Sequence, residues 1–113
     1  MKPRSCKAKG RRLQNALAAD LQKMLGLAEA DVKPSVMGEQ GMDLKLSSAA
    51  RSRFPFAVEA KNCEALSIWR SLEQAEKNAK AEGLKPLLAF KRNGSKIYVA
   101  MAWNDFLELC SML

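Results

Sequence analysis

The sequence feature that most constrains the fold is the segment Phe56–Asn62, FAVEAKN, in which an apolar run leads directly into a carboxylate and an ammonium group. Side chains alternate between the two faces of a β-strand. A strand here would therefore place Phe56, Val58 and Ala60 on one face, with Glu59 and Lys61 together on the other. Because a buried charge is costly unless it is paired or bound to a metal, we expect the rest of the chain to supply a partner for these two groups.

Length and composition indicate one folded domain. The chain has 113 residues and is 48% hydrophobic, which is enough for one modest core. No apolar stretch reaches the roughly 18 residues of a membrane span, and no signal-like segment follows the basic start. The sequence has three widely spaced cysteines and no histidine, so it favours free thiols in a reducing cytoplasm and argues against a zinc site or a histidine-dependent triad.

Positive charge is concentrated at the N-terminus. The net charge is +7, and no acidic residue precedes Asp20, whereas the region after Arg12 is nearly neutral. This imbalance predicts a polyanion partner, with a phosphate backbone as the first choice and a solubilising tail as the alternative. We expect residues 1–7 to form a flexible basic arm and residues 8–113 to form a single domain.

Hydrophobic periodicity predicts the order α-β-β-β-α-β-β-α, an α/β fold with a mixed sheet flanked by helices. Glycines are expected to end both long helices, and an Asn-Gly pair signals a hairpin between the last two strands. Asn104 or Asp105 is expected to cap the last helix. The expected elements are a helix over 8–25, strands over 32–37 and 42–46, a polar turn over 47–55, a strand over 56–61, a helix over 67–82, strands over 84–91 and 96–103, and a helix over 106–112.

Asp43 supplies the expected partner for the charged strand. The strand over 42–46 would form a hairpin with 56–61, which places Asp43 and Glu59 within reach of one metal ion. Mg²⁺ prefers carboxylate and carbonyl oxygens, so the backbone carbonyl of Ala60 is a third candidate ligand and Glu39, from a glycine loop, a fourth. Lys61 beside such a metal could orient or activate a water that attacks a phosphodiester. The alternative is an ordinary ion pair between Glu59 and Lys61 on an exposed sheet face.

These motifs together resemble the PD-(D/E)XK nuclease superfamily. The resemblance rests on an early helix, then Gly41-Met42-Asp43, then Val58-Glu59-Ala60-Lys61-Asn62, then a helix bearing Gln74. It implies a restriction-endonuclease-like core in which Asp43 and Glu59 bind metal, Lys61 is catalytic and Gln74 is a further site residue. Many members carry a glutamate in the first helix where this chain has Gln14, an amide that can orient water but gives no charge to a metal.

Within the superfamily, the chain looks most similar to small phage and archaeal Holliday-junction resolvases. These proteins have a basic Lys-Gly start to the first helix, here Lys9-Gly10-Arg11-Arg12. The resemblance implies a homodimeric endonuclease that uses Mg²⁺, with Mn²⁺ as a possible substitute, to cut branched DNA such as four-way junctions. It also implies a cytoplasmic location, in a bacterial host cell if the protein is phage-encoded, and no membrane partner.

The candidate DNA-binding residues are basic side chains near the start of the first helix and in the turn between the two site strands. Solvated loop arginines are the alternative for the second group. Two other functions stay open: a nuclease that cuts linear duplex, and a non-catalytic DNA-binding domain, which the glutamine in the first helix keeps possible. The candidates are Lys7 at the end of the arm, Lys9, Arg11 and Arg12 at the start of the helix, and Arg51 and Arg53 in the turn.

Overall fold

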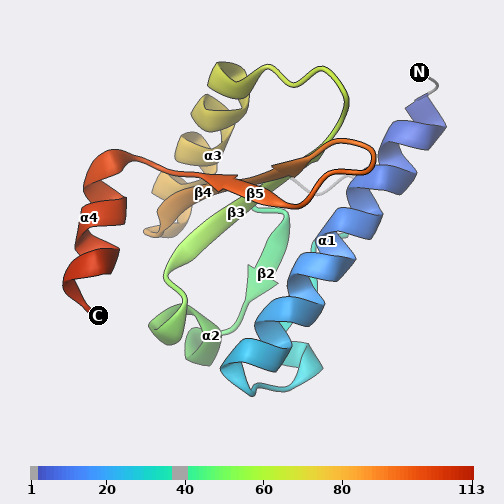
Figure 1. Ribbon diagram of the computed structural model, residues 1–113. Helices are drawn as coiled ribbons and strands as arrows, with labels where there is room; N and C mark the ends of the chain where they lie inside the picture. The colour runs from blue at the N-terminus through green and yellow to red at the C-terminus, as the bar shows by residue number, and fades with distance from the viewer. Residues whose placement is uncertain (1–2, 37–40) are drawn as a thin grey trace.

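The chain folds into a mixed β-sheet with helices on both of its faces (Figure 1). The computed structural model describes residues 3–36 and 41–113. The order of elements confirms the predicted fold class, with two short helical elements added. The elements are α1 (Pro3–Leu25), the 3-10 turn η1 (Glu29–Asp31), β1 (Val32–Pro34), β2 (Leu44–Leu46), α2 (Ser48–Arg53), β3 (Phe56–Asn62), α3 (Ile68–Glu82), β4 (Lys85–Lys91), β5 (Tyr98–Ala100) and α4 (Trp103–Ser111).

The main sheet has the strand order β3-β4-β5. Strands β3 and β4 are parallel over seven residue pairs, and β5 runs antiparallel to β4. A parallel pair needs a long crossover, which α3 provides. Gly83 ends α3 in the left-handed conformation, and Gly94 adopts a positive φ in the β4–β5 turn, as the two glycine signals predicted.

The two faces of β3 pack against different elements. Val58 packs in the larger core cluster with residues of α1, β1, β2 and α2, whereas Ala57 packs with Ala79 of α3. Ala57, Glu59 and Lys61 thus share the α3 face, and the alternation confirms that Val58 lies on the face opposite the two charged side chains. Helix α1 is tied to the end of β3 by a hydrogen bond of 3.1 Å from Asn62 Nδ2 to the Lys9 carbonyl.

The prediction of a hairpin between the two site strands is wrong, because these strands do not pair with each other. Strand β2 pairs antiparallel with β1 in a separate two-stranded sheet, and α2 lies between β2 and β3. The chain turns away because Ser47 caps a helix, its side chain accepting from the Ala50 N–H at 3.2 Å. The two sheets meet where the Asp43 N–H donates to the Val58 carbonyl at 2.9 Å, so the contact that matters for the site is made without a hairpin.

Element boundaries differ from expectation mostly at the ends. Helix α1 begins at Pro3, so the described part of the expected arm is helical. Strands β1 and β5 are shorter than the apolar patterns suggested, and α4 begins at Trp103 after Ala102 instead of after Asn104 or Asp105. None of the described helices is long and apolar enough to cross a membrane.

Helix α4 stands apart from the core, at the far side of the sheet from α1 (Figure 1). None of its residues is buried. Lys85 at the start of β4 holds it through ion pairs to Glu108 at 2.6 Å and to Asp105 at 3.8 Å. The helix therefore presents much of its apolar surface to the outside.

Candidate active site

Strand β3 brings Glu59 and Lys61 to one place on the α3 face of the sheet. The Glu59 residue is 2% exposed, whereas about a third of the Lys61 side chain is exposed. The Lys61 Nζ lies 3.5 Å from Glu59 Oε2. The carboxylate is thus buried beneath an ammonium group that still reaches solvent, which differs from an exposed surface ion pair.

Asp43 approaches β3 from its open edge, the edge opposite β4. Its N–H donates to the Val58 carbonyl, and its Oδ2 accepts from the Ala60 N–H at 2.6 Å. The N–H and C=O of one strand residue point to the same side, so the Ala60 carbonyl lies at the same edge. The two carboxylates and this carbonyl are therefore neighbours, as the sequence predicted.

Asn78 of α3 completes the surroundings of Glu59. Its Nδ2 lies 3.2 Å from Glu59 Oε1 and 3.1 Å from the Gly41 carbonyl. One oxygen of Glu59 thus faces Lys61 and the other accepts from an amide. The sequence predicted Gln74, one turn earlier on α3, as the site residue of this helix, and Asn78 was not predicted. The four-residue spacing of these two amides was the available signal, but only the helix position shows which one reaches β3.

Burial disfavours the ionised form of both carboxylates. It is the main cause that raises the pKa of Asp43 above its ordinary value, against the lowering effects of the Ala60 hydrogen bond and Lys61. Burial and the neighbouring Asp43 charge raise the pKa of Glu59 to about 7, although Lys61 and Asn78 oppose the shift. When ionised, the carboxylates of Asp43 and Glu59 repel each other. The ammonium group of Lys61 does not fully offset the effect of burial and repulsion on their pKa values.

A hard divalent cation fits this donor set. Carboxylate and carbonyl oxygens are the ligands that Mg²⁺ prefers, and it commonly uses only one or two protein carboxylates. Across residues 3–36 and 41–113, no three acidic, histidine or cysteine side chains form a metal-binding cluster. Asp43, Glu59 and the Ala60 carbonyl would hold the metal, and a cation there would favour the ionised form of both carboxylates.

The remaining predicted site residues are not brought into this cluster. Glu39 lies outside the described residues. Gln14 is half-buried on α1 and Gln74 is exposed on α3, and among the described residues neither side chain is hydrogen-bonded to another residue. Their assignment to the site stays a prediction.

The six basic candidates fall into three groups. Lys7, Arg11 and Arg12 are exposed on α1, as a phosphate-binding surface requires, but Lys9 is only 9% exposed. The two arginines predicted in a loop lie instead in or at the end of α2 and serve the fold. Arg51 pairs with Glu82 at 2.7 Å and donates to the Leu46 carbonyl, and Arg53 donates to the Leu25 carbonyl.

The fold and the Asp43–Glu59–Lys61 constellation define a nuclease of the PD-(D/E)XK superfamily. The sequence model of a family described as "phage putative PDDEXK endonuclease" matches residues 5–112, and the chain belongs to this family. Members of this superfamily generally use divalent metals, which agrees with the donor set. Comparison with curated proteins and with solved structures gave no significant match.

Without metal, the protein should lose stability as the pH rises. The folded state binds the Glu59 proton more tightly than the unfolded chain, since the pKa is about 7 in the fold and ordinarily 4.5. The stabilising proton is present below pH 4.5 and is lost as the pH rises through 7. Urea unfolding in EDTA should give a lower free energy of unfolding at pH 8 than at pH 5, and Glu59→Gln should flatten this dependence. Glu73→Gln, an exposed change on α3, is the control. An equal slope in Glu59→Gln and wild type would contradict the assignment.

Proposed function

We propose that the protein is a Mg²⁺-dependent endodeoxyribonuclease of the Holliday-junction resolvase type, with Mn²⁺ as a substitute metal. The observation that carries the proposal is the pair formed by half-buried Asp43 and buried Glu59, beside the partly exposed side chain of Lys61. Phosphodiester hydrolysis needs charge stabilisation and a positioned water, and these groups lie where both could be supplied.

Each residue has a separate task in the proposed mechanism. Asp43, Glu59 and the Ala60 carbonyl hold the cation. When bound, the cation stabilises charge on the phosphate and makes water a better nucleophile. Lys61 orients the attacking water or a phosphate oxygen with an ammonium group that is buried on the Glu59 side and open on the other. Asn78 fixes the orientation of the Glu59 carboxylate through its hydrogen bond.

The DNA would be held mainly by its backbone. Lys7, Arg11 and Arg12 are exposed basic residues on successive turns of α1. Contacts to phosphates position DNA without reading its sequence, which suits an enzyme that selects substrate by shape. The described residues form one small domain and include no separate sequence-reading module, so we propose branched DNA as the substrate. We also propose that the enzyme acts in the cytoplasm of a bacterial host.

A cleavage assay tests the proposal directly. The protein is incubated with Mg²⁺ and either a four-way junction or a linear duplex of matched sequence. We expect cuts near the branch that fall by at least about 100-fold in Asp43→Asn, Glu59→Gln and Lys61→Met, since each removes a metal ligand or a group that assists proton transfer. Junction binding measured in EDTA should survive these substitutions. Asp20→Asn, an exposed change on α1, should cleave like the wild type.

An assay result that differs from the expected one would identify which alternative function is correct. Equal cutting of the linear duplex would overturn branch selectivity but retain the nuclease. Tight junction binding without cleavage in either Mg²⁺ or Mn²⁺ would favour a non-catalytic DNA-binding domain. Undiminished cleavage by Lys61→Met would refute the role given to that side chain.

A second copy of the chain is the proposed partner of the protein. A four-way junction must be cut in two strands, so a twofold dimer with two sites suits the task. The surface that fits a self-association interface is on α4, where Trp103 and Phe106 are 69% and 43% exposed and their rings lie 5.9 Å apart. Aromatic residues are enriched in interface cores, and Leu107 and Met112 extend the same exposed apolar helix.

Disrupting this surface should give monomers. We expect sedimentation of the wild type as a dimer, and of Trp103→Lys/Phe106→Lys as a folded monomer, because charges at the centre of an apolar interface would have to be buried. Met24→Lys, at a 63% exposed position on α1, is the matched control and should stay dimeric. A monomeric wild type, or a double variant that stays dimeric, would contradict the proposed interface.

A further inference from the structure

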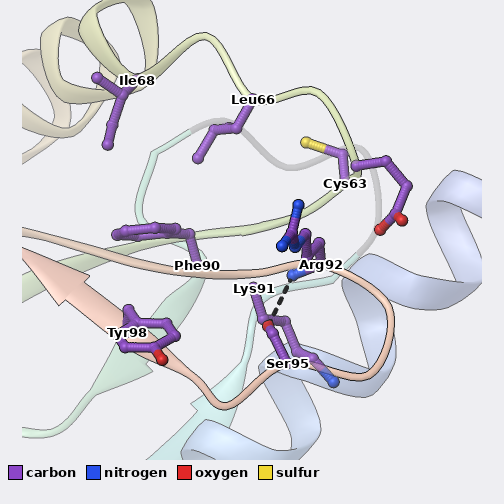
Figure 2. Close-up of a pocket in the computed structure, with 9 residues that line it drawn as sticks. Cys63, Leu66, Ile68, Phe90, Lys91, Arg92, Ser95 and Tyr98 are labelled. Atoms are coloured by element: carbon purple, nitrogen blue, oxygen red, sulfur yellow. Dashed lines mark hydrogen bonds between the residues drawn. The ribbon is translucent and has the colours of Figure 1, made fainter.

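A cavity of about 330 Å³ lies beside the proposed catalytic site and is used by none of the steps above. It is enclosed by the connection from β3 to α3, the start of α3, and the ends of β4 and β5 (Figure 2). Leu66 and Ile68 point into it from one side, and Phe90 and Tyr98 line it from the sheet. The cavity is thus walled by apolar and aromatic side chains and is open to solvent at its rim.

The strand register places this cavity on the catalytic face of the sheet. Lys61 pairs with Phe90 across the parallel β3–β4 ladder, and Phe90 pairs with Tyr98 across the antiparallel β4–β5 ladder. Directly paired residues have their side chains on the same face, and neighbouring strands are about 4.8 Å apart. Lys61, Phe90 and Tyr98 therefore form one row, which leads from the catalytic lysine into the cavity.

The aromatic pair offers a surface for stacking. The rings of Phe90 and Tyr98 lie 6.2 Å apart at 34°, too close to admit another ring between them, so a planar ligand would lie on an outer ring face. Tyr98 is 54% exposed, which leaves such a face available.

Arg92 supplies the cation at the mouth of the cavity. It belongs to the lining, and its N–H donates to Ser95 Oγ at 3.0 Å, which fixes the turn after β4. Lys91 also belongs to the lining, but its side chain leaves β4 on the face opposite the aromatic rings. Glu64 is the acidic member of the lining, and its carboxylate accepts from the Asn93 N–H at 2.6 Å. Aromatic faces with a guanidinium group beside them match a planar base attached to a phosphate.

We propose that this cavity binds one unpaired nucleobase of the DNA strand whose phosphate lies at Lys61. The inference rests on the proposed nuclease function and names the feature of the substrate that the site selects. A base inside a regular duplex is stacked and paired, and it cannot lie on Tyr98 without being extruded. The base of a single-stranded flap is already unpaired, and a pair at a branch point lacks the continuous stacking of a regular duplex, so the cavity favours these structures over linear duplex.

The experiment measures binding in EDTA, where no cleavage occurs. One labelled branched duplex carries a short single-stranded thymidine flap, and a second carries the same flap built of abasic sites. We expect the wild type to bind the thymidine flap at least about 5-fold more tightly, since stacking on an aromatic side chain strengthens binding by about this much or more for each base. Tyr98→Leu should bring the ratio of the two affinities close to one, and Tyr98→Phe should preserve it.

Val99→Leu is the matched control. Val99 is 58% exposed and follows Tyr98 on the same strand, so its side chain points to the opposite face. We expect this variant to keep the wild-type ratio. Equal affinities of the wild type for the two flaps, or an unchanged ratio in Tyr98→Leu, would overturn the proposal. Because binding is measured without metal, loss of base preference with intact cleavage would refute the cavity alone, and base preference without cleavage would refute the nuclease function alone.

Discussion

The burial of Glu59 next to Asp43 is the interaction on which the rest of the structure depends. Glu59 is 2% exposed on the edge strand β3, and Lys61 and Asn78 reach its two carboxylate oxygens while a second acid approaches from the open edge. This arrangement raises the pKa of both acids, so it costs stability in the absence of a cation. A site that costs stability is the expected sign of a function, and it supports the proposed binding of a divalent metal.

The α3 face of the sheet unites the proposed catalytic and base-binding features. Parallel pairing of β3 with β4 aligns Lys61 with Phe90, and α3 runs back over the same face so that Asn78 meets Glu59 and Ile68 meets the cavity. The opposite face packs against α1 in the larger core cluster, and a small core cluster lies on the α3 face. The face with the smaller cluster is the one that carries the proposed catalytic and base-binding groups.

Local sequence patterns predicted the parts of the fold that depend on neighbours in the chain. The alternation in FAVEAKN predicted the two faces of β3, and the glycines after α1 and α3 predicted where those helices end. The pattern could not show that Ser47 begins a helix, which removes the hairpin and recruits Arg51 and Arg53 into structural contacts. Nor could it show that Asn78, rather than Gln74, faces Glu59, because the rotation of a helix over a sheet is decided by packing of distant residues.

Calorimetric titration with Mn²⁺ measures directly whether Asp43 and Glu59 hold a metal. We expect saturable binding to the wild type that strengthens from pH 6 to pH 8, because the cation must displace the proton of a Glu59 whose pKa is about 7. We expect Asp43→Asn to abolish this binding. No saturable binding to the wild type at pH 8, or equal binding to Asp43→Asn, would contradict the assignment of Asp43 and Glu59 as a metal centre.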